Sequence, residues 1–323
     1  MQKYFEADTL DDLMFDVFKT LLSSENKIEA TRGLMTEILG ATLVLKNPRS
    51  RLSRSETKGK VFSAFGELFW YLTGQNRLDF IVYYVGRHYV NESDDEETVR
   101  SGYGERLFNS SGSINQVSNV IELLLRKPNS RQAVIQLFDA TDINQKYKSI
   151  PCTCTLQFLL RNGKLNLFVN MRSNDVFLGL PHDIFSFTML QEIVARSIGV
   201  DIGVYQHSVG SLHLYENRRA DAKQYLSEGF YEETSMKPMP EGDPWSSIEK
   251  VRKIEEQIRA GSLKTLDSIT IDPYWKDVCR VLLIHRYFKD ENWSGCKQLK
   301  LGFHDQAFNI FVEDRLARKQ DSC

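Results

Sequence analysis

Cys152 is the residue with the clearest potential for chemistry. It lies in the segment Pro151-Cys-Thr-Cys-Thr155, and a cysteine thiolate can act as a nucleophile. Because the thiolate is the reactive form, such a site needs positive charge nearby, which Arg172 could supply. Taken alone, Cys152 is more simply a small buried apolar residue. A single Cys-x-Cys pair with Cys154 is weak support for zinc, so we expect no metal.

A predicted hairpin must position this cysteine. Asn162-Gly163 separates two strand-like runs, residues 153–161 and 164–173, and is typical of a two-residue type I′ turn. Counting outward from the turn places Cys152 opposite Ser173, on one face of the hairpin. Arg172 then points to the other face, unless a β-bulge or an early end to pairing re-aims it.

Glu67 is a candidate acid or base on a predicted helix. Apolar residues recur at helical spacing over residues 56–74 and form one stripe. Glu67 lies nearly opposite that stripe, flanked by Ser63 and Trp70 rather than by charged residues. Both faces of this helix are therefore expected to be covered, although a solvated glutamate remains the alternative.

Asp183, His213 and Tyr215 are further polar candidates on predicted elements. Asp183 falls in the first turn of a helix predicted from Pro181 to about Gly199. His213 and Tyr215 are two residues apart on a predicted strand, so they share one face of it.

Composition narrows the class of protein. The chain has 323 residues and a formal net charge of −2, so it has no basic excess for binding nucleic acid. Its five cysteines are scattered, which suits a reducing compartment. Residues 1–22 lack the layout of a signal peptide, and no apolar run reaches the length of a membrane span. We expect a cytoplasmic protein without membrane or nucleic-acid partners.

The rest of the chain suggests one main domain and an extension. Residues 131–139 alternate like a buried strand, and the acidic run 92–97 is predicted to be a solvated loop without a role. A proline-rich connector over residues 236–245 marks a boundary. We place a catalytic domain at residues 1–235 and a C-terminal helical extension at residues 236–323.

Several motifs occur together in an order that resembles the thymidylate synthase family. Pro151-Cys-Thr-Cys-Thr-Leu-Gln-Phe158 resembles the nucleophile segment, and Arg172-Ser-Asn-Asp-Val-Phe-Leu-Gly-Leu-Pro181 resembles the nucleotide and folate segment. The other members of the set are Glu67 within Gly-Glu-Leu-Phe-Trp70, Tyr103 within Gly-Tyr-Gly104, Ser130-Arg131 and His213-Leu-Tyr215. The ordered set is more specific than any one motif.

The resemblance implies a fold and a reaction. The fold is α+β: a mixed, twisted sheet with helices on one face, whose other face forms a homodimer with shared active sites. The reaction transfers a one-carbon unit from 5,10-methylenetetrahydrofolate to C5 of a pyrimidine nucleoside monophosphate. Cys152 would add to C6 and make C5 nucleophilic. Glu67 matches a buried glutamate that orders water and relays protons, a role that a raised pKa would suit.

The resemblance also assigns binding residues for the nucleotide. Arg172 would hold the phosphate with Ser173 and with Arg131 of the other subunit, because planar guanidinium groups suit phosphate oxygens. Arg32 resembles a further phosphate ligand. Surface ion pairs are the alternative for each arginine. His213 and Tyr215 match the pair that holds the sugar 3′-hydroxyl, and Tyr103 is a further substrate-binding residue.

The folate side of the site shows departures from a thymidylate synthase. Asp175 matches the aspartate that meets the pterin, and Leu178 and Gly179 belong to the same segment. Tyr89 stands where thymidylate synthases carry a tryptophan over the reactive methylene, which would open the methylene to water. The C-terminal residues 312–323 do not resemble the apolar tail that closes a thymidylate synthase site.

Asp183 is the departure with the most chemistry. Thymidylate synthases carry asparagine here, which complements uracil, whereas deoxycytidylate and cytidylate hydroxymethylases resemble this chain in carrying aspartate. A carboxyl group can accept from the cytosine amino group and donate to N3. A simple helix cap, which stabilises by about 1 kcal/mol, is the alternative.

These features favour hydroxymethylation of CMP or dCMP. The first alternative is thymidylate synthesis from dUMP. The second, from a different class, is a nucleotide-binding protein without catalysis, which would need neither Cys152 nor Glu67.

Overall fold

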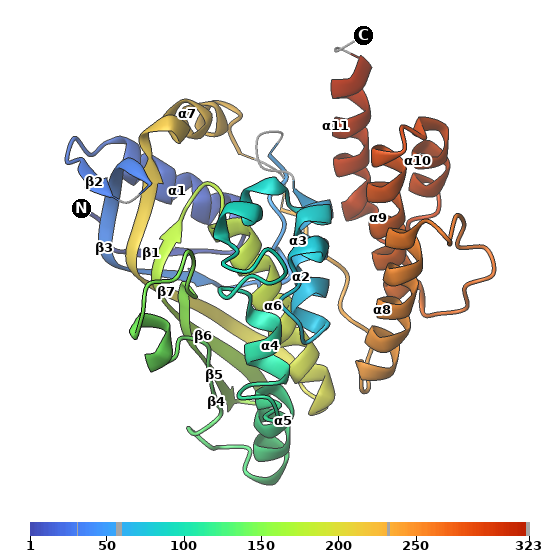
Figure 1. Cartoon of the computed structure of the whole chain (residues 1–323), viewed down its shortest axis with the longest axis horizontal. Coiled ribbons are helices and arrows are strands. Elements are labelled where there is room, and N and C mark those ends of the chain that lie inside the picture. The colour runs from blue at the N-terminus through green and yellow to red at the C-terminus, as the bar shows by residue number, and fades with distance from the viewer. Residues whose placement is uncertain (31, 56–59, 231–232, 321–323) are drawn as a thin grey trace.

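A seven-stranded mixed sheet forms one side of the molecule (Figure 1). The computed structural model describes residues 1–30, 32–55, 60–230 and 233–320. The strand order is β1-β3-β7-β6-β5-β4, with β2 paired to β3; the β1–β3 and β6–β7 pairs are parallel and the others antiparallel. The strands are β1 (Tyr4–Ala7), β2 (Ile28–Ala30), β3 (Gly33–Leu45), β4 (Val134–Gln136), β5 (Thr153–Arg161), β6 (Lys164–Asp175) and β7 (Asp201–Tyr215).

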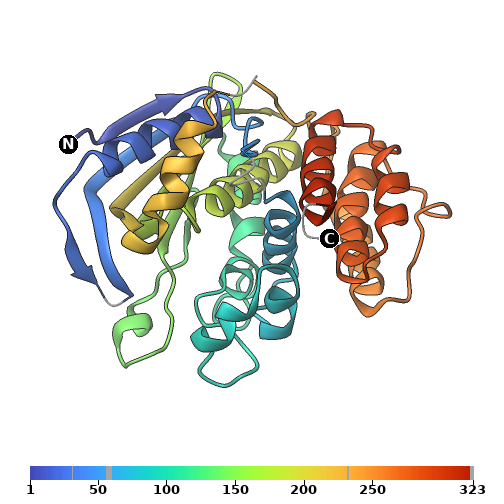
Figure 2. The same cartoon turned by 90° about the horizontal axis from the view of Figure 1, so that it is seen from above.

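Helices build two further layers beside the sheet. α6 packs on β6 and β7, α2 packs on α6, and α9 packs on the other side of α2 (Figure 2). The helices are α1 (Leu10–Leu22), α2 (Val61–Leu72), α3 (Leu78–Tyr84), α4 (Tyr103–Phe108), α5 (Gln116–Arg126), α6 (Leu180–Ser197), α7 (Arg219–Ser227), α8 (Trp245–Ala260), α9 (Pro273–Lys289), α10 (Trp293–Lys300) and α11 (Asn309–Gln320), with short 3-10 helices η1 (Arg87–Glu92), η2 (Ala140–Ile143), η3 (Glu216–Arg218) and η4 (Gln306–Phe308). The predicted α+β fold is confirmed.

The β5–β6 hairpin forms around the predicted turn. Asn162 and Gly163 both have positive φ, 51° and 72°, as a type I′ turn requires. The predicted register holds outward from Arg161–Lys164 as far as Thr155–Asn170.

Beyond that point the register slips by one residue. Thr153 pairs with Met171, and the backbone N–H of Arg172 donates to the carbonyl of Cys152 at 2.9 Å. The prediction that Cys152 lies opposite Ser173 is therefore wrong by one residue. The bulge at Cys154 is the reason, because an extra residue on one strand moves every later pair along.

The slip belongs to a bend that crosses three neighbouring strands. Gly40 of β3, Gly210 of β7 and Arg172 of β6 occupy adjacent positions in the register. Along β6 the buried side chains alternate from Leu165 to Met171, and the next buried one is Asn174. In each of these strands the alternation of side chains between the two sheet faces therefore shifts at the bend. As a result, the side chains of residues 173–175 do not point to the faces that a regular strand would give them.

α2 is covered on all sides, as its sequence indicated. Every residue of Val61–Leu72 except Ser63 is buried, Glu67 included. The helix packs against both α6 and α9. Residues 56–59 of the predicted helix lie outside the described residues, and the helix begins at Val61.

Two other predicted segments differ in part. The strand predicted over residues 131–139 is reduced to Val134–Gln136. The acidic run begins at Glu92, the last residue of η1, and Glu92 is not a solvated loop residue: its side chain is only 16% exposed and pairs with Arg32. The run of acidic residues predicted a solvated loop. It gave no sign that Glu92 pairs with a cation that is distant in the sequence.

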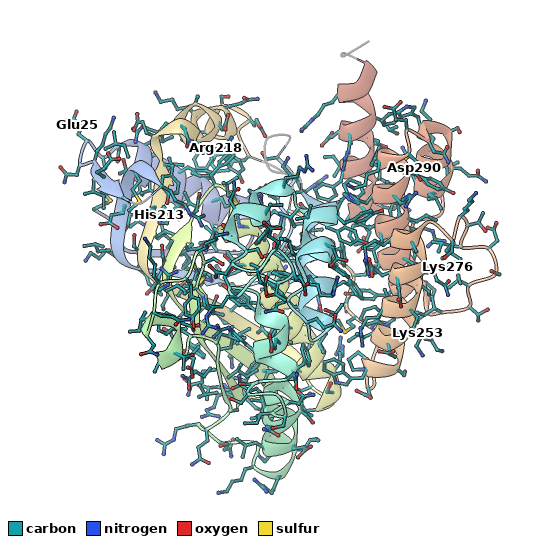
Figure 3. All side chains as sticks on the ribbon, in the orientation of Figure 1. Glu25, His213, Arg218, Lys253, Lys276 and Asp290 are labelled. Carbon is teal, nitrogen blue, oxygen red and sulfur yellow. The ribbon has the colours of Figure 1, made fainter. Side chains whose placement is uncertain are left out.

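The C-terminal helices α8–α11 form the layer farthest from the sheet (Figures 1 and 2). Their buried residues belong to the same hydrophobic core as the rest of the described chain. Lys253, Lys276 and Asp290 lie on this side of the molecule, away from His213 and Arg218 (Figure 3). The boundary at residue 235 stays a prediction. Within the described segments, every helix is too short or too polar to cross a membrane.

Candidate active site

A large cavity opens between the carboxyl ends of β6 and β7, the helices α2 and α6, and the C-terminal helices. Its volume is about 1770 Å³. Every predicted site residue except Arg131 lines it: Arg32, Glu67, Tyr89, Tyr103, Cys152, Arg172, Ser173, Asp175, Leu178, Gly179, Asp183, His213 and Tyr215. Arg131 is exposed before β4 and lies outside the cavity. The volume exceeds the roughly 300–1,000 Å³ of an ordinary small-molecule pocket, so two ligands can be accommodated side by side.

Cys152 lies just before β5, with the guanidinium of Arg172 beside it. Arg172 donates from Nε to the carbonyl of Pro151 at 2.9 Å and from Nη2 to the carbonyl of Ile150 at 3.1 Å. These bonds hold Nη2 at 3.6 Å from the Cys152 sulfur. The β-bulge thus brings the two residues together. This is the arrangement that Arg172 needs if it is to supply positive charge to the cysteine.

The Cys152 thiol is not strongly activated in this arrangement. Burial raises its pKa, and the positive charge of Arg172 opposes that effect only in part. Asp183 raises the pKa further, whereas Arg32 lowers it. Neutralising the nearby carboxyl groups would therefore favour the thiolate.

Glu67 is buried in the wall of the cavity rather than solvated. Its side chain is 8% exposed, and the Tyr71 hydroxyl donates to its Oε1 at 2.6 Å. Burial raises the pKa of Glu67 to about 7, while the hydrogen bond from Tyr71 opposes the shift. A carboxyl group with this pKa can both give and take a proton near neutral pH.

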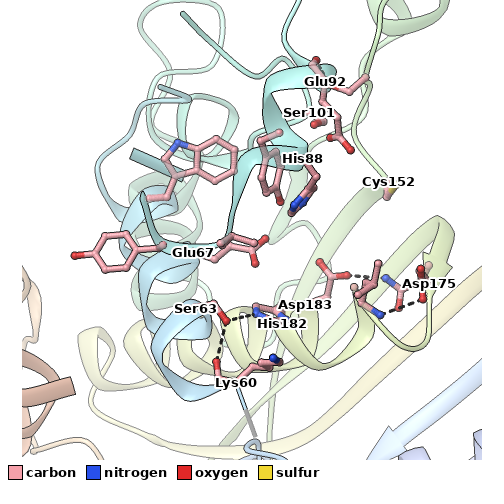
Figure 4. A pocket seen from close by; sticks show the side chains of 18 of the residues that line it. Lys60, Ser63, Glu67, His88, Glu92, Ser101, Cys152, Asp175, His182 and Asp183 are labelled. Atoms are coloured by element: carbon pink, nitrogen blue, oxygen red, sulfur yellow. Dashed lines mark hydrogen bonds between the residues drawn. The ribbon is translucent and has the colours of Figure 1, made fainter. Parts of the chain in front are cut away.

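Asp183 lies on α6 and points into the same cavity (Figure 4). Its Oδ2 accepts a hydrogen bond of 2.6 Å from Nδ2 of Asn174, and within the described residues its carboxyl accepts from no backbone N–H of the first turn. A capping role is therefore not what this side chain performs. Burial raises the pKa of Asp183 well above its usual range, and the charge of Glu67 adds to this shift.

Arg32 is held by Glu92 at the edge of the cavity. Its Nη2 lies 2.8 Å from Glu92 Oε1, and the arginine side chain remains 64% exposed. The Glu92 carboxylate is close enough to raise the pKa of Glu67 and of Cys152. An anion that binds Arg32 would compete with Glu92 for it.

The end of β7 and the start of α4 place three further residues. His213 Nδ1 donates to the carbonyl of Ser211 at 3.2 Å, and its ring meets Tyr215 edge-on with centroids 5.0 Å apart. The Tyr103 hydroxyl accepts from the backbone N–H of Thr153 at 3.2 Å and from its hydroxyl at 2.8 Å. Tyr103 thereby braces the strand that begins directly after Cys152.

The loop between β6 and α6 forms another part of the wall. Asp175 Oδ1 accepts from the backbone N–H groups of Phe177 and Leu178, at 2.7 and 3.1 Å. This turn leaves Leu178 exposed at the cavity. Tyr89 of η1 also lines the cavity, and its ring meets Trp70 edge-on at 5.7 Å. An exposed apolar side chain and a partly buried aromatic ring in the wall suit a flat ring system, so the residues present fit a folate.

Sequence reasoning missed several residues of the cavity. Tyr71 lies four residues after Glu67, a helical spacing that could have identified it. Asn174 was inside a recognised motif, but nothing local links it to Asp183. The C-terminal helices contribute Phe288, Trp293, Phe311, Asp314, Arg315 and Arg318, for which the sequence held no signal. In the described residues no group of three or more His, Cys, Asp or Glu side chains could hold a metal.

A family model confirms the resemblance. The model described as thymidylate synthase matches residues 33–255, well over half of the chain. The match includes every residue predicted for the site except Arg32, which precedes it by one position. It ends inside α8, so most of the C-terminal helices lie beyond it. The chain belongs to the thymidylate synthase family.

Proposed function

We propose that this enzyme hydroxymethylates C5 of CMP or dCMP, with 5,10-methylenetetrahydrofolate as the one-carbon donor. Family membership supports the coarser activity, transfer of a one-carbon unit to a pyrimidine. The single observation that carries the finer proposal is the buried carboxyl group of Asp183 at the position that reads the base.

Asp183 suits cytosine because of its protonation. A buried carboxyl group whose pKa is raised stays neutral and offers one donor and one acceptor. Cytosine presents the complementary pair, an acceptor at N3 and a donor at the 4-amino group. A neutral acid can therefore satisfy both groups without burying a charge.

The remaining residues divide the chemistry. Cys152 adds to C6, which places electron density on C5, and the ring nitrogen N3 takes up the proton that Asp183 provides. The donor supplies the one-carbon unit to C5. Glu67, with a pKa near 7, accepts and returns protons through water as the C5 proton leaves and the thiolate is expelled.

Water is the proposed final nucleophile. Tyr89 carries a hydroxyl group into the region where thymidylate synthases have a tryptophan, and Glu67 lines the same cavity. A polar wall of this kind supports water attack on the one-carbon unit, which gives a hydroxymethyl product and leaves tetrahydrofolate.

A homodimer with shared sites completes the proposal. The sheet face opposite α6 exposes Val204, and Leu39, which is 58% exposed, lies at the bend of β3. Apolar side chains on a sheet face are typical of a surface that a second copy covers. Arg131 lies outside the cavity of its own chain, which supports a role in the partner's site.

A product assay by mass tests the proposal. CMP, dCMP, UMP and dUMP are offered in turn with the donor, and the Cys152→Ala variant serves as the control, expected to bind nucleotide without turnover. We expect a product heavier by a hydroxymethyl group from a cytidine nucleotide. Turnover of dUMP alone, with a methyl product, would favour thymidylate synthesis, and normal turnover by Cys152→Ala would exclude the covalent adduct.

A further inference from the structure

Asn174 and Asp183 form a closely packed pair at the base-reading end of the cavity. Asn174 is the penultimate residue of β6 and pairs with Leu212 of β7, so the sheet holds its backbone. Its Nδ2 lies 2.6 Å from Asp183 Oδ2, and its side chain is 4% exposed. A Cβ on Gly179 would lie only 3.2 Å from this Nδ2 and 3.3 Å from this Oδ2, so the loop leaves little room for a side chain beside the pair.

Among the described residues, the side-chain amide of Asn174 hydrogen-bonds to Asp183 alone. Its Oδ1 is buried and has no hydrogen-bond partner among the described residues. Turning the amide over would direct Oδ1 at the Asp183 oxygen and would then require the proton to lie on Oδ2. The observed orientation therefore makes Asn174 a donor to the carboxyl group, at the expense of an unsatisfied acceptor.

A donor on one carboxyl oxygen decides where a proton can reside on the group. Oδ2 must use a lone pair to accept from Nδ2, so it acts as the carbonyl-like oxygen of the neutral acid. We propose that Asn174 is a positioning residue that places the proton of Asp183 on Oδ1 and thereby sets which base the enzyme accepts. This inference rests on the proposed role of Asp183 in reading the base.

The position of the proton decides which carboxyl oxygen of Asp183 is the hydrogen-bond donor and which is the acceptor. A neutral carboxyl group can pair with either pyrimidine, depending on which oxygen carries the proton. With the proton opposite N3 it complements cytosine, and with the proton opposite the 4-substituent it complements uracil. Without Asn174 the proton can occupy either oxygen, and the distinction between the bases should weaken.

Two substitutions test this with nucleotide binding as the readout. N174D replaces the donor by a second carboxyl group of the same shape, so that one proton is shared between the two acids. N174A removes the donor without adding charge. Dissociation constants for CMP, dCMP, UMP and dUMP are measured by calorimetry in the Cys152→Ala background, where no turnover interferes.

N115D is the matched control for the amide-to-acid change. Asn115 caps α5 by accepting from Ser118 at 2.9 Å, a role that aspartate fills equally well, and it lies outside the cavity. Its base preference should equal that of the parent chain.

We expect the ratio of cytidine to uridine affinity to fall at least about tenfold in N174D and N174A, because a mispaired buried polar group opposes the favoured base. If one variant fails to fold, the affinity ratio of the other variant decides the test. A ratio within about twofold of the parent's in a folded variant would overturn the inference. The parent's own preference tests the proposed function separately: a parent that prefers uridine nucleotides would refute the cytidylate proposal, while a shift of at least about tenfold in its affinity ratio on substitution would still support a role of Asn174 in the choice of base.

Discussion

The chemistry is expected to be carried by Cys152, Glu67 and Asp183, and all three line one cavity. Each has a neighbouring side chain that affects its ionisation. Arg172 lies beside the thiol, Tyr71 donates to Glu67, and Asn174 donates to Asp183. Both carboxyl groups have raised pKa values, mainly because of burial. With both acids protonated, Arg172 makes the largest charge contribution at the thiol, and this charge lowers the pKa of Cys152.

At the residue scale, Asp183→Asn tests base reading. Asparagine complements uracil, so activity on cytidine nucleotides should fall and relative affinity for uridine nucleotides should rise. Mispairing a buried polar group costs about 1 to 3 kcal/mol, which predicts a change of at least about tenfold in preference. Steady-state kinetics with all four monophosphates measures it. An unchanged preference would mean that Asp183 does not contact the base.

Tyr71→Phe tests whether Glu67 transfers protons. The Tyr71 hydrogen bond lowers the pKa of Glu67, so its removal should raise that pKa above its present value of about 7. The midpoint of the pH–rate limb that depends on Glu67 should move to higher pH by about half a unit to one unit. Tyr225→Phe, which breaks a comparable bond to Asp11 away from the cavity, is the control. Equal profiles in all three proteins would remove Glu67 from the rate-determining step.

At the scale of elements, the bend across β3, β7 and β6 decides which side chains reach the cavity. Regular pairing from the hairpin turn would have left Arg172 on the face away from Cys152. The bulge at Cys154 aligns the two residues, and the adjacent glycines allow the neighbouring strands to bend at the same level. Geometry at the active site is therefore a property of three strands rather than of one motif.

Gly210→Ala tests this dependence. A Cβ at position 210 would lie 2.8 Å from the backbone oxygen of Arg172, so the strand that carries the arginine must shift. We expect a loss of about 1–3 kcal/mol in stability and a higher thiol pKa for Cys152, read from the pH dependence of alkylation. Val209→Ala is the control, because it removes buried side-chain atoms from the same strand at a position that pairs with Met171 rather than with Arg172. Equal thiol pKa values in both variants would show that the bend does not position the arginine.

Much of this arrangement could be predicted from the sequence, and the rest has identifiable causes. The Asn162-Gly163 turn, the covered helix around Glu67 and the α6 helix follow from local turn chemistry and periodicity. The register beyond Thr155 did not, because a bulge depends on neighbouring strands. Glu92 and Asn174 were missed since their partners, Arg32 and Asp183, are brought to them only by the fold.

At the scale of the whole molecule, the described chain supplies a cavity that lacks one expected phosphate ligand. Arg131 lies outside it, and the proposed homodimer would supply this residue from a second copy. Side chains of α9, α10 and α11, which lie beyond the family match, form part of the cavity wall.

Mixing two inactive variants tests the shared site. Cys152→Ala lacks the nucleophile, and Arg131→Ala lacks the proposed contribution to the partner's phosphate site. In a heterodimer one of the two sites has both residues intact. Equal mixing after unfolding and refolding should therefore restore about a quarter of wild-type activity. Heterodimers that form, as shown by mass, but stay inactive would exclude sharing through Arg131.

The wall built by α2 and α10 also gives the protein an optical property. Trp70 and Trp293 both line the cavity, whereas Trp275 is packed in the core and Trp245 lies outside it. A ligand with a large aromatic ring that enters the cavity will change the emission of two of the four tryptophans. Occupancy can thus be followed in the unlabelled protein, and replacing Trp70 or Trp293 with phenylalanine would show which of the two tryptophans responds to the ligand.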